Sequence, residues 1–203
     1  MKQFNPEKSP LIIRFSKIIS NFFNPLTALF IYFVYSSSLQ YNLSETAKLF
    51  LPLLLIVVIP ISAWIYWNVR KGNYSNMDVS NRKQRKSLYF FIATTLFLFL
   101  FYDYFFNENI DLIVTFLLLL LLLMQLSNYF VKSSMHTAFN IFVAALFFGL
   151  NPTLGIIWFL IAVLVGVTRI ILKRHTVIEV ISGALIALLV SFIYLYANIQ
   201  YQH

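Results

Sequence analysis

The residues best suited to chemistry lie close together between the last two long apolar runs of the chain. Glu179 follows His175 by four residues, and Arg169 precedes that histidine by six residues. If the last helix begins near Lys173 or Arg174, the histidine and the glutamate share one helical face. The carboxylate would then hold one ring nitrogen and leave the other free as a nucleophile, while the guanidinium offers a planar fork to a phosphoryl group. The spacing therefore predicts phosphoryl-transfer chemistry.

The composition indicates where this chemistry takes place. Of the 203 residues, 60% are hydrophobic and 11% are charged, and the mean hydropathy is +0.80. A soluble domain cannot bury this much apolar surface, so we expect an integral membrane protein. The chain has no cysteine, which excludes disulfides and thiolate metal sites. The net charge of +8 comes from short basic clusters between apolar runs, a pattern of juxtamembrane loops, and we expect no nucleic-acid partner.

Apolar segments recur along the chain at lengths close to those of membrane spans. A helix needs about 20 residues to cross the hydrocarbon layer. We therefore expect an all-α, polytopic transmembrane helix bundle of six to seven spans, in which Pro52 and Pro60 bend the second span. The segments lie at about 25–40, 46–68, 87–106, 110–131, 137–150, 154–172 and 176–197.

The N-terminal segment has a different pattern. Its apolar residues recur at helical spacing among basic residues, which predicts an amphipathic interfacial helix. We expect residues 1–203 to form a single integral-membrane domain, with 1–23 as the interfacial segment and 25–197 as the helix bundle. The apolar positions are Leu11, Ile12, Phe15, Ile18, Ile19 and Phe22.

Counting the crossings brings three linkers to one face of the bundle. They follow the second, fourth and sixth spans and carry His136, His175 and most of the basic residues. Asp103, Glu108 and Asp111 fall on the opposite face. Positive residues favour the cytoplasm, so we expect an active site on the cytoplasmic face of a bacterial plasma (inner) membrane.

These residues resemble the signatures of the type 2 phosphatidic acid phosphatase superfamily. The run from Thr168-Arg169 through His175 to Glu179 is similar to its third signature, SRxxxxxHxxxD. "SSMH", residues 133–136, resembles the second, PSGH, and "DVSNRKQRK" from Asp78 resembles a degenerate first signature, KxxxxxxRP.

The resemblance implies a metal-independent lipid phosphatase that needs no cofactor. It implies that His175 attacks phosphorus to form a phosphohistidine, that Glu179 orients it, and that His136 protonates the leaving oxygen and then activates water. The substrate would be a membrane lipid phosphate or diphosphate, such as phosphatidate, phosphatidylglycerophosphate or a polyprenyl diphosphate, drawn from the bilayer. The phosphate-binding residues would be Arg169, Arg85, Lys132 and Ser134, with Arg82, Lys83 and Arg174 as further candidates.

The chain also departs from the family pattern. Asp78 stands in place of the lysine of the first signature, Lys86 in place of its proline, and Met135 in place of the glycine of PSGH. Glu179 replaces aspartate and lengthens the arm by one methylene. The changes at Asp78 and Met135 slightly favour an alternative, a weak or inactive relative that binds or translocates phospholipid head groups. An intramembrane prenyltransferase ranks last, because it would need paired aspartates to hold magnesium.

Overall fold

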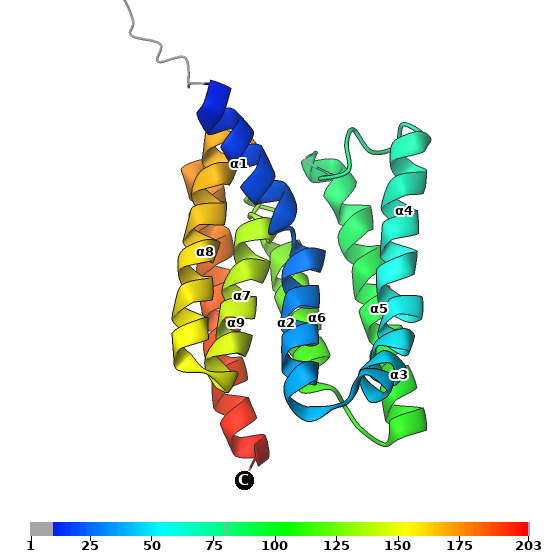
Figure 1. Cartoon of the computed structure of the whole chain (residues 1–203). Helices are drawn as coiled ribbons and strands as arrows, with labels where there is room; N and C mark the ends of the chain where they lie inside the picture. The colour runs from blue at the N-terminus through cyan, green and yellow to red at the C-terminus, as the bar shows by residue number, and fades with distance from the viewer. Residues whose placement is uncertain (1–9, 80, 203) are drawn as a thin grey trace, which may run out of the picture.

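A computed structural model describes residues 10–79 and 81–202. This part of the chain is helical and contains no strand. Figure 1 shows the helices side by side in one bundle. In chain order they are α1 (Pro10–Phe22), α2 (Pro25–Gln40), α3 (Leu43–Leu53), the π-helical η1 (Leu54–Val58), α4 (Ile59–Arg70), α5 (Arg82–Asn107), α6 (Leu112–Ser127), α7 (Met135–Leu150), α8 (Pro152–Ile171) and α9 (Val177–Gln202).

Polar side chains fix where many of the helices begin. Asn24 caps α2 by accepting from the backbone N–H of Thr27, and Asn42 forms a reciprocal capping box with Glu45 at α3. Side chains at the N-caps of α5, α6, α7 and α8 accept backbone hydrogen bonds in the same way. Each cap satisfies N–H groups that lack a partner within the helix. The helix boundaries therefore follow local sequence.

The expected number of spans is not confirmed. Four helices are long and apolar enough to cross a membrane, or up to five if α1 and α2, which are bent by 55°, form one broken span. Helices α3, η1 and α4 join into one 28-residue helix, with the π-helical turn between Pro52 and Pro60. Helices α6 and α7 have only 16 residues each. The stretch 110–131 was expected to be one span, but its helix ends at Ser127 because the chain turns at 128–131.

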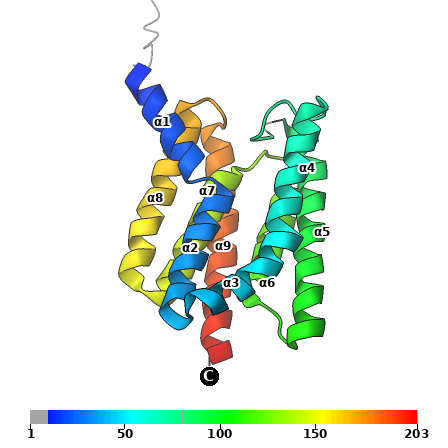
Figure 2. The same cartoon turned by 45° about the vertical axis from the view of Figure 1, so that its right-hand side comes forward.

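Helix α7 forms the centre of one side of the bundle. It packs against α2, α8 and α9 (Figures 1 and 2), and every residue from His136 to Phe147 is buried. Trp158 of α8 stacks on Phe147 at a centroid distance of 4.8 Å. Because its neighbours enclose it, α7 keeps its backbone and side chains from His136 to Phe147 away from lipid. A helix of 16 residues can therefore lie inside the bundle without crossing the whole membrane.

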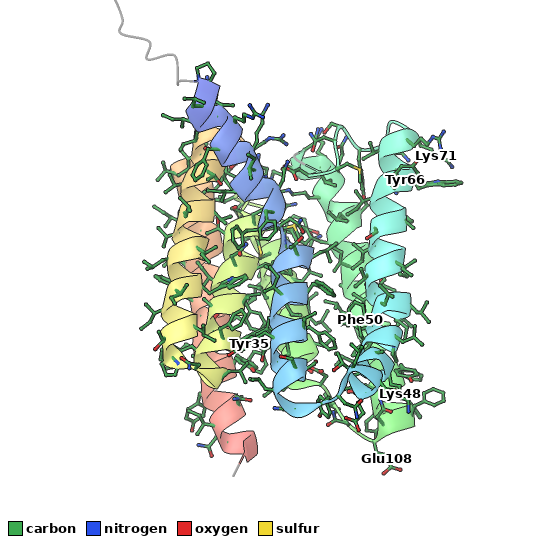
Figure 3. All side chains as sticks on the ribbon, viewed as in Figure 1. Tyr35, Lys48, Phe50, Tyr66, Lys71 and Glu108 are labelled. Atoms are coloured by element: carbon green, nitrogen blue, oxygen red, sulfur yellow. The ribbon has the colours of Figure 1, made fainter. Side chains whose placement is uncertain are left out.

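The outer surface is apolar. Phe90, Phe97 and Phe105 of α5 and Phe192 of α9 are all more than half exposed, as suits a surface in contact with lipid. In Figure 3, Lys71 lies at one end of the bundle and Glu108 at the other, in agreement with the predicted separation of basic and acidic linkers.

Helix α1 lies in the N-terminal segment, but the predicted amphipathic interfacial helix is not confirmed. It buries Ser16, Ile19 and Ser20 and exposes Leu11 and Phe15. An interfacial position stays a prediction, because α1 and α2 together also satisfy the criteria for a broken span. Residues 1–9 of the expected segment lie outside the described residues.

Candidate active site

Three linkers meet at one end of the bundle, as the crossing count predicted. They are residues 71–81, 128–134 and 172–176, between α4 and α5, α6 and α7, and α8 and α9. Hydrogen bonds join them directly: Arg174 donates to the carboxylate of Asp78 at 3.0 Å, and Lys132 donates to the carbonyl of Arg174 at 3.2 Å. Arg85, near the start of α5, adds bonds to the carbonyl of Ser133 at 2.9 Å and to the ring of His175 at 3.3 Å. Residues from distant parts of the sequence thus form one cluster.

His175 and Glu179 form the contact that their spacing predicted, but not on one helix. Helix α9 begins at Val177, so the expected start near residues 173–174 is wrong and the histidine lies in the preceding linker. Lys173 has a φ of +55°, which ends the helical path after α8. Thr176 and Glu179 then form a reciprocal capping box, with backbone-to-side-chain distances of 3.1 and 3.3 Å.

The same glutamate holds the imidazole. The distance from His175 Nδ1 to Glu179 Oε2 is 2.8 Å. Nδ1 therefore carries the proton and donates a hydrogen bond to the carboxylate, which leaves Nε2 unprotonated. Burial, followed by the positive charges of Arg85, Arg169 and Lys132, lowers the pKa of His175 to about 2. The ring is thus neutral near pH 7, the state required of a nucleophile.

Arg85 fixes the other side of this ring. Its Nε donates to the carbonyl of Val79 at 3.0 Å, its Nη1 donates to the carbonyl of Ser133, and its Nη2 lies 3.3 Å from His175 Nε2. Its side chain is buried. A guanidinium held by two carbonyls has little freedom to rotate, so one donor points steadily at the proposed nucleophile.

The guanidinium group of Arg169 forms fewer hydrogen bonds than it can donate. It is 1% exposed, and its Nη1 donates to Ser20 Oγ at 2.9 Å and to Asp78 Oδ2 at 3.1 Å. Its Nε and Nη2 find no hydrogen-bond partner in the described part of the chain. Buried polar groups are normally satisfied, so unpaired guanidinium donors point to an anionic ligand such as a phosphoryl group. The contact with Ser20 was not foreseeable, because α1 is distant in sequence.

Asp78 lies between basic side chains of the site. Its Oδ2 accepts from Arg169 and, at 3.0 Å, from Arg174, and its Oδ1 lies 3.9 Å from His136 Nε2. Burial acts to raise the pKa of Asp78, but His136 and the two guanidiniums outweigh burial and hold the pKa below its usual value. The sequence marked this residue only as a missing lysine. The structure makes it a partner of three site residues.

Lys132 and Ser134 lie beside the pair formed by His175 and Glu179. Lys132 Nζ lies 3.7 Å from Glu179 Oε2 and donates to the carbonyl of Arg174 at 3.2 Å. The hydroxyl of Ser134 caps α7, and its backbone N–H donates to the carbonyl of Glu179 at 2.9 Å. A Cβ on Gly183 would lie 2.8 Å from the carbonyl oxygen of Ser134, so the glycine permits the close approach of α9 to Ser134.

Arg82 and Lys83 are not brought to the histidines. The guanidinium of Arg82 donates to the carbonyls of Asn128 and Tyr129, and Lys83 is exposed. Neither forms a hydrogen bond or ion pair with His136 or His175 among the described contacts. Arg82 instead lines an open pocket of about 420 Å³ whose other lining residues are Phe130, Val131, Lys132, Thr176, Ile178 and Glu179.

Comparison with known proteins agrees with the motif reading. Residues 125–201 match the model of the PAP2 superfamily. This segment contains His136, Arg169, His175 and Glu179, whereas Arg85 and Asp78 lie outside it. No curated protein and no solved structure matches the chain. In the described ranges, no group of three or more histidines and carboxylates is placed to hold a metal ion.

Proposed function

We propose that this chain, whose residues 125–201 match the model of the PAP2 superfamily, is an integral-membrane phosphatase that hydrolyses a lipid phosphate or diphosphate through a phosphohistidine. The observation that carries the proposal is the double restraint on His175. Glu179 holds Nδ1 at 2.8 Å, while Arg85 presents a buried guanidinium 3.3 Å from Nε2. A nucleophile and a phosphate-binding cation therefore face the same point in space.

In the first step, His175 Nε2 attacks phosphorus in line. The N–P bond forms as the P–O bond to the leaving group breaks, and His136 gives its proton to the departing oxygen. Arg85, Arg169 and Lys132 offset the charge on the equatorial oxygens, with Arg174 at the edge of the site. Phosphoryl transfer depends mainly on such positioning and charge.

In the second step, water replaces the histidine on phosphorus. His136, now unprotonated, accepts a proton from that water, and the N–P bond breaks to release inorganic phosphate. The proton taken from water leaves His136 protonated, as at the start of the cycle. The negative charge of a bound phosphate favours this protonated form, because burial and the nearby Arg169 otherwise lower the pKa of His136 to about 3. Glu179 keeps the ring in one orientation throughout both steps.

The open pocket offers a route from the bilayer. Phe130 and Ile178 line it and are 78% and 69% exposed, while Lys132 and Glu179 line its polar side. A lipid would place its chain along the apolar side and its phosphate towards the cations. We also propose six to seven membrane crossings and a site on the cytoplasmic face, in line with the basic linkers.

The test is phosphate release from phosphatidate, phosphatidylglycerophosphate and a polyprenyl diphosphate in the presence of EDTA. The full chain should release phosphate, and His175→Ala should lower the rate by about 1,000-fold or more. His203→Ala, which changes the third histidine of the chain, serves as the matched control. Full activity in His175→Ala would rule out the mechanism. Acid-labile, base-stable labelling from a ³²P-labelled substrate would identify the phosphohistidine directly.

One observation favours the alternative function, a relative that binds or moves phospholipid head groups without hydrolysis. The carboxylate of Asp78 pairs with Arg169 and Arg174, two cations that a reacting phosphate would need. Saturable binding of phosphatidate vesicles without phosphate release from any of the three substrates would support this alternative.

A further inference from the structure

Asp78 lies on the side of the proposed site that holds His136. Its nearest partners are His136, Arg169 and Arg174, at 3.9, 3.1 and 3.0 Å. It forms no contact with His175 among the described hydrogen bonds and ion pairs. His136 is the proposed donor to the leaving oxygen, so the carboxylate lies beside the leaving group and not beside the nucleophile.

The backbone holds this carboxylate in place. The next residue, Val79, is fully buried and has a φ of +45°, a conformation that a β-branched residue rarely adopts. Its N–H donates to the carbonyl of Asn76 at 3.0 Å, and its own carbonyl accepts from Arg85 Nε. The arginine that faces His175 therefore also fixes the turn that points Asp78 inward.

The two substrate classes differ in the leaving group that Asp78 would meet. When a phosphomonoester reacts, the bond from phosphorus to the lipid oxygen breaks, His136 supplies the proton, and a neutral alcohol leaves. When a diphosphate reacts, the anhydride bond breaks, and the leaving group is a lipid phosphate that still carries negative charge. A fixed carboxylate repels that anion and also pairs with the two guanidiniums that would neutralise it.

We propose that Asp78 makes this site selective for lipid phosphomonoesters over lipid diphosphates. The inference rests on the proposed phosphatase function and narrows its substrate class. Asp78 acts here as a specificity residue: it repels a charged leaving group and tolerates a neutral one.

The test compares kcat/KM for phosphatidate and for a polyprenyl diphosphate, using the purified full chain in detergent. The wild-type protein should prefer phosphatidate. Asp78→Asn keeps the shape of the side chain and removes its charge, so the ratio of diphosphate to monoester kcat/KM should rise about tenfold or more. Glu108→Gln is the matched control, because it removes one exposed acid at the opposite end of the bundle and should leave the ratio unchanged.

Two results would overturn the inference: a wild-type preference for the diphosphate, or an unchanged ratio in a folded Asp78→Asn protein. If that variant does not fold, the wild-type preference alone decides. Binding of orthophosphate and pyrophosphate, measured by calorimetry, separates this inference from the proposed function. If no substrate is hydrolysed, a larger gain in pyrophosphate than in orthophosphate affinity in Asp78→Asn still supports the role of Asp78, and equal gains contradict it.

Discussion

The two sides of the bundle contribute to the candidate site in different ways. Helices α7, α8 and α9 pack closely and carry His136, Arg169, His175 and Glu179 within or beside them. The other side, α3 to α5, sends only the turn before α5 and its first residues into the site. The first region supplies the proposed reacting groups on closely packed helices. The second region adds one cation, Arg85, and one acid, Asp78, through side-chain hydrogen bonds. It can therefore change the charge of the site while the packing of α7, α8 and α9 stays the same.

The largest expected effect is in the first region. Glu179→Gln should lower kcat by about 100-fold to 1,000-fold, because the amide no longer fixes the imidazole with Nδ1 protonated. Unfolding temperature should change little, since an amide oxygen can still accept from the Thr176 N–H in the capping box. Steady-state kinetics and a thermal melt, run together, separate the two roles. A kcat within threefold of wild type would exclude Glu179 as the residue that orients His175.

The corresponding change in the second region is Arg85→Lys. A lysine cannot bond the carbonyls of Val79 and Ser133 and also face His175, so we expect kcat/KM to fall by about 100-fold. Lys83→Gln is the matched control, because this exposed neighbour should leave kcat/KM within about twofold. If Arg85→Lys retained full kcat/KM, charge alone would suffice and the fork geometry would be unimportant.

The rigidity of the first region can be tested by adding one methyl group. In Gly183→Ala, the Cβ would lie 2.8 Å from the Ser134 carbonyl oxygen, and we expect a loss of about 1–3 kcal/mol in stability. Gly149→Ala is the control, since the nearest atom to its Cβ would be 3.7 Å away. Thermal unfolding in detergent measures both. Equal melting temperatures for the two variants would show that α9 can move away from Ser134.

The smallest expected effect is on how the stability of the fold depends on pH. The pKa of Asp78 is lowered in the folded protein, so its ion pairs stabilise the fold above the ordinary aspartate pKa of about 4 and lose this contribution as pH falls through the lowered value. The difference in melting temperature between wild type and Asp78→Asn should therefore stay constant from about pH 5 to 8 and shrink only in stronger acid. A difference that disappears near pH 6 would contradict a lowered pKa.

The spacing of His175 and Glu179 was enough to predict their contact, because the two residues are only four positions apart. The spacing of Arg169 did not predict the partners of its side chain, which are Ser20 and Asp78. The capping residues were also readable: Thr176 followed three residues later by Glu179 is a helix-start signal. This signal indicates a start of α9 just after Thr176, as the structure shows. The prediction of a start near Lys173 or Arg174 did not use it. The crossing count placed Lys132 at this end of the bundle, but its position beside Glu179 was not predicted.

The sequence by itself determined the all-helical class, the apolar outer surface, the gathering of three linkers at one end and the pairing of His175 with Glu179. These features depend on hydrophobicity, helix period and short separations along the chain. Only the tertiary structure decided that Arg169 meets Ser20 and Asp78, that Arg85 lies against His175, and that Arg82 bonds to the end of α6. Such contacts join residues about 50 to 150 positions apart in the sequence, and the packing angles of whole helices set them. No local pattern specifies those angles, so the charge balance of the site could not be predicted from the chain alone.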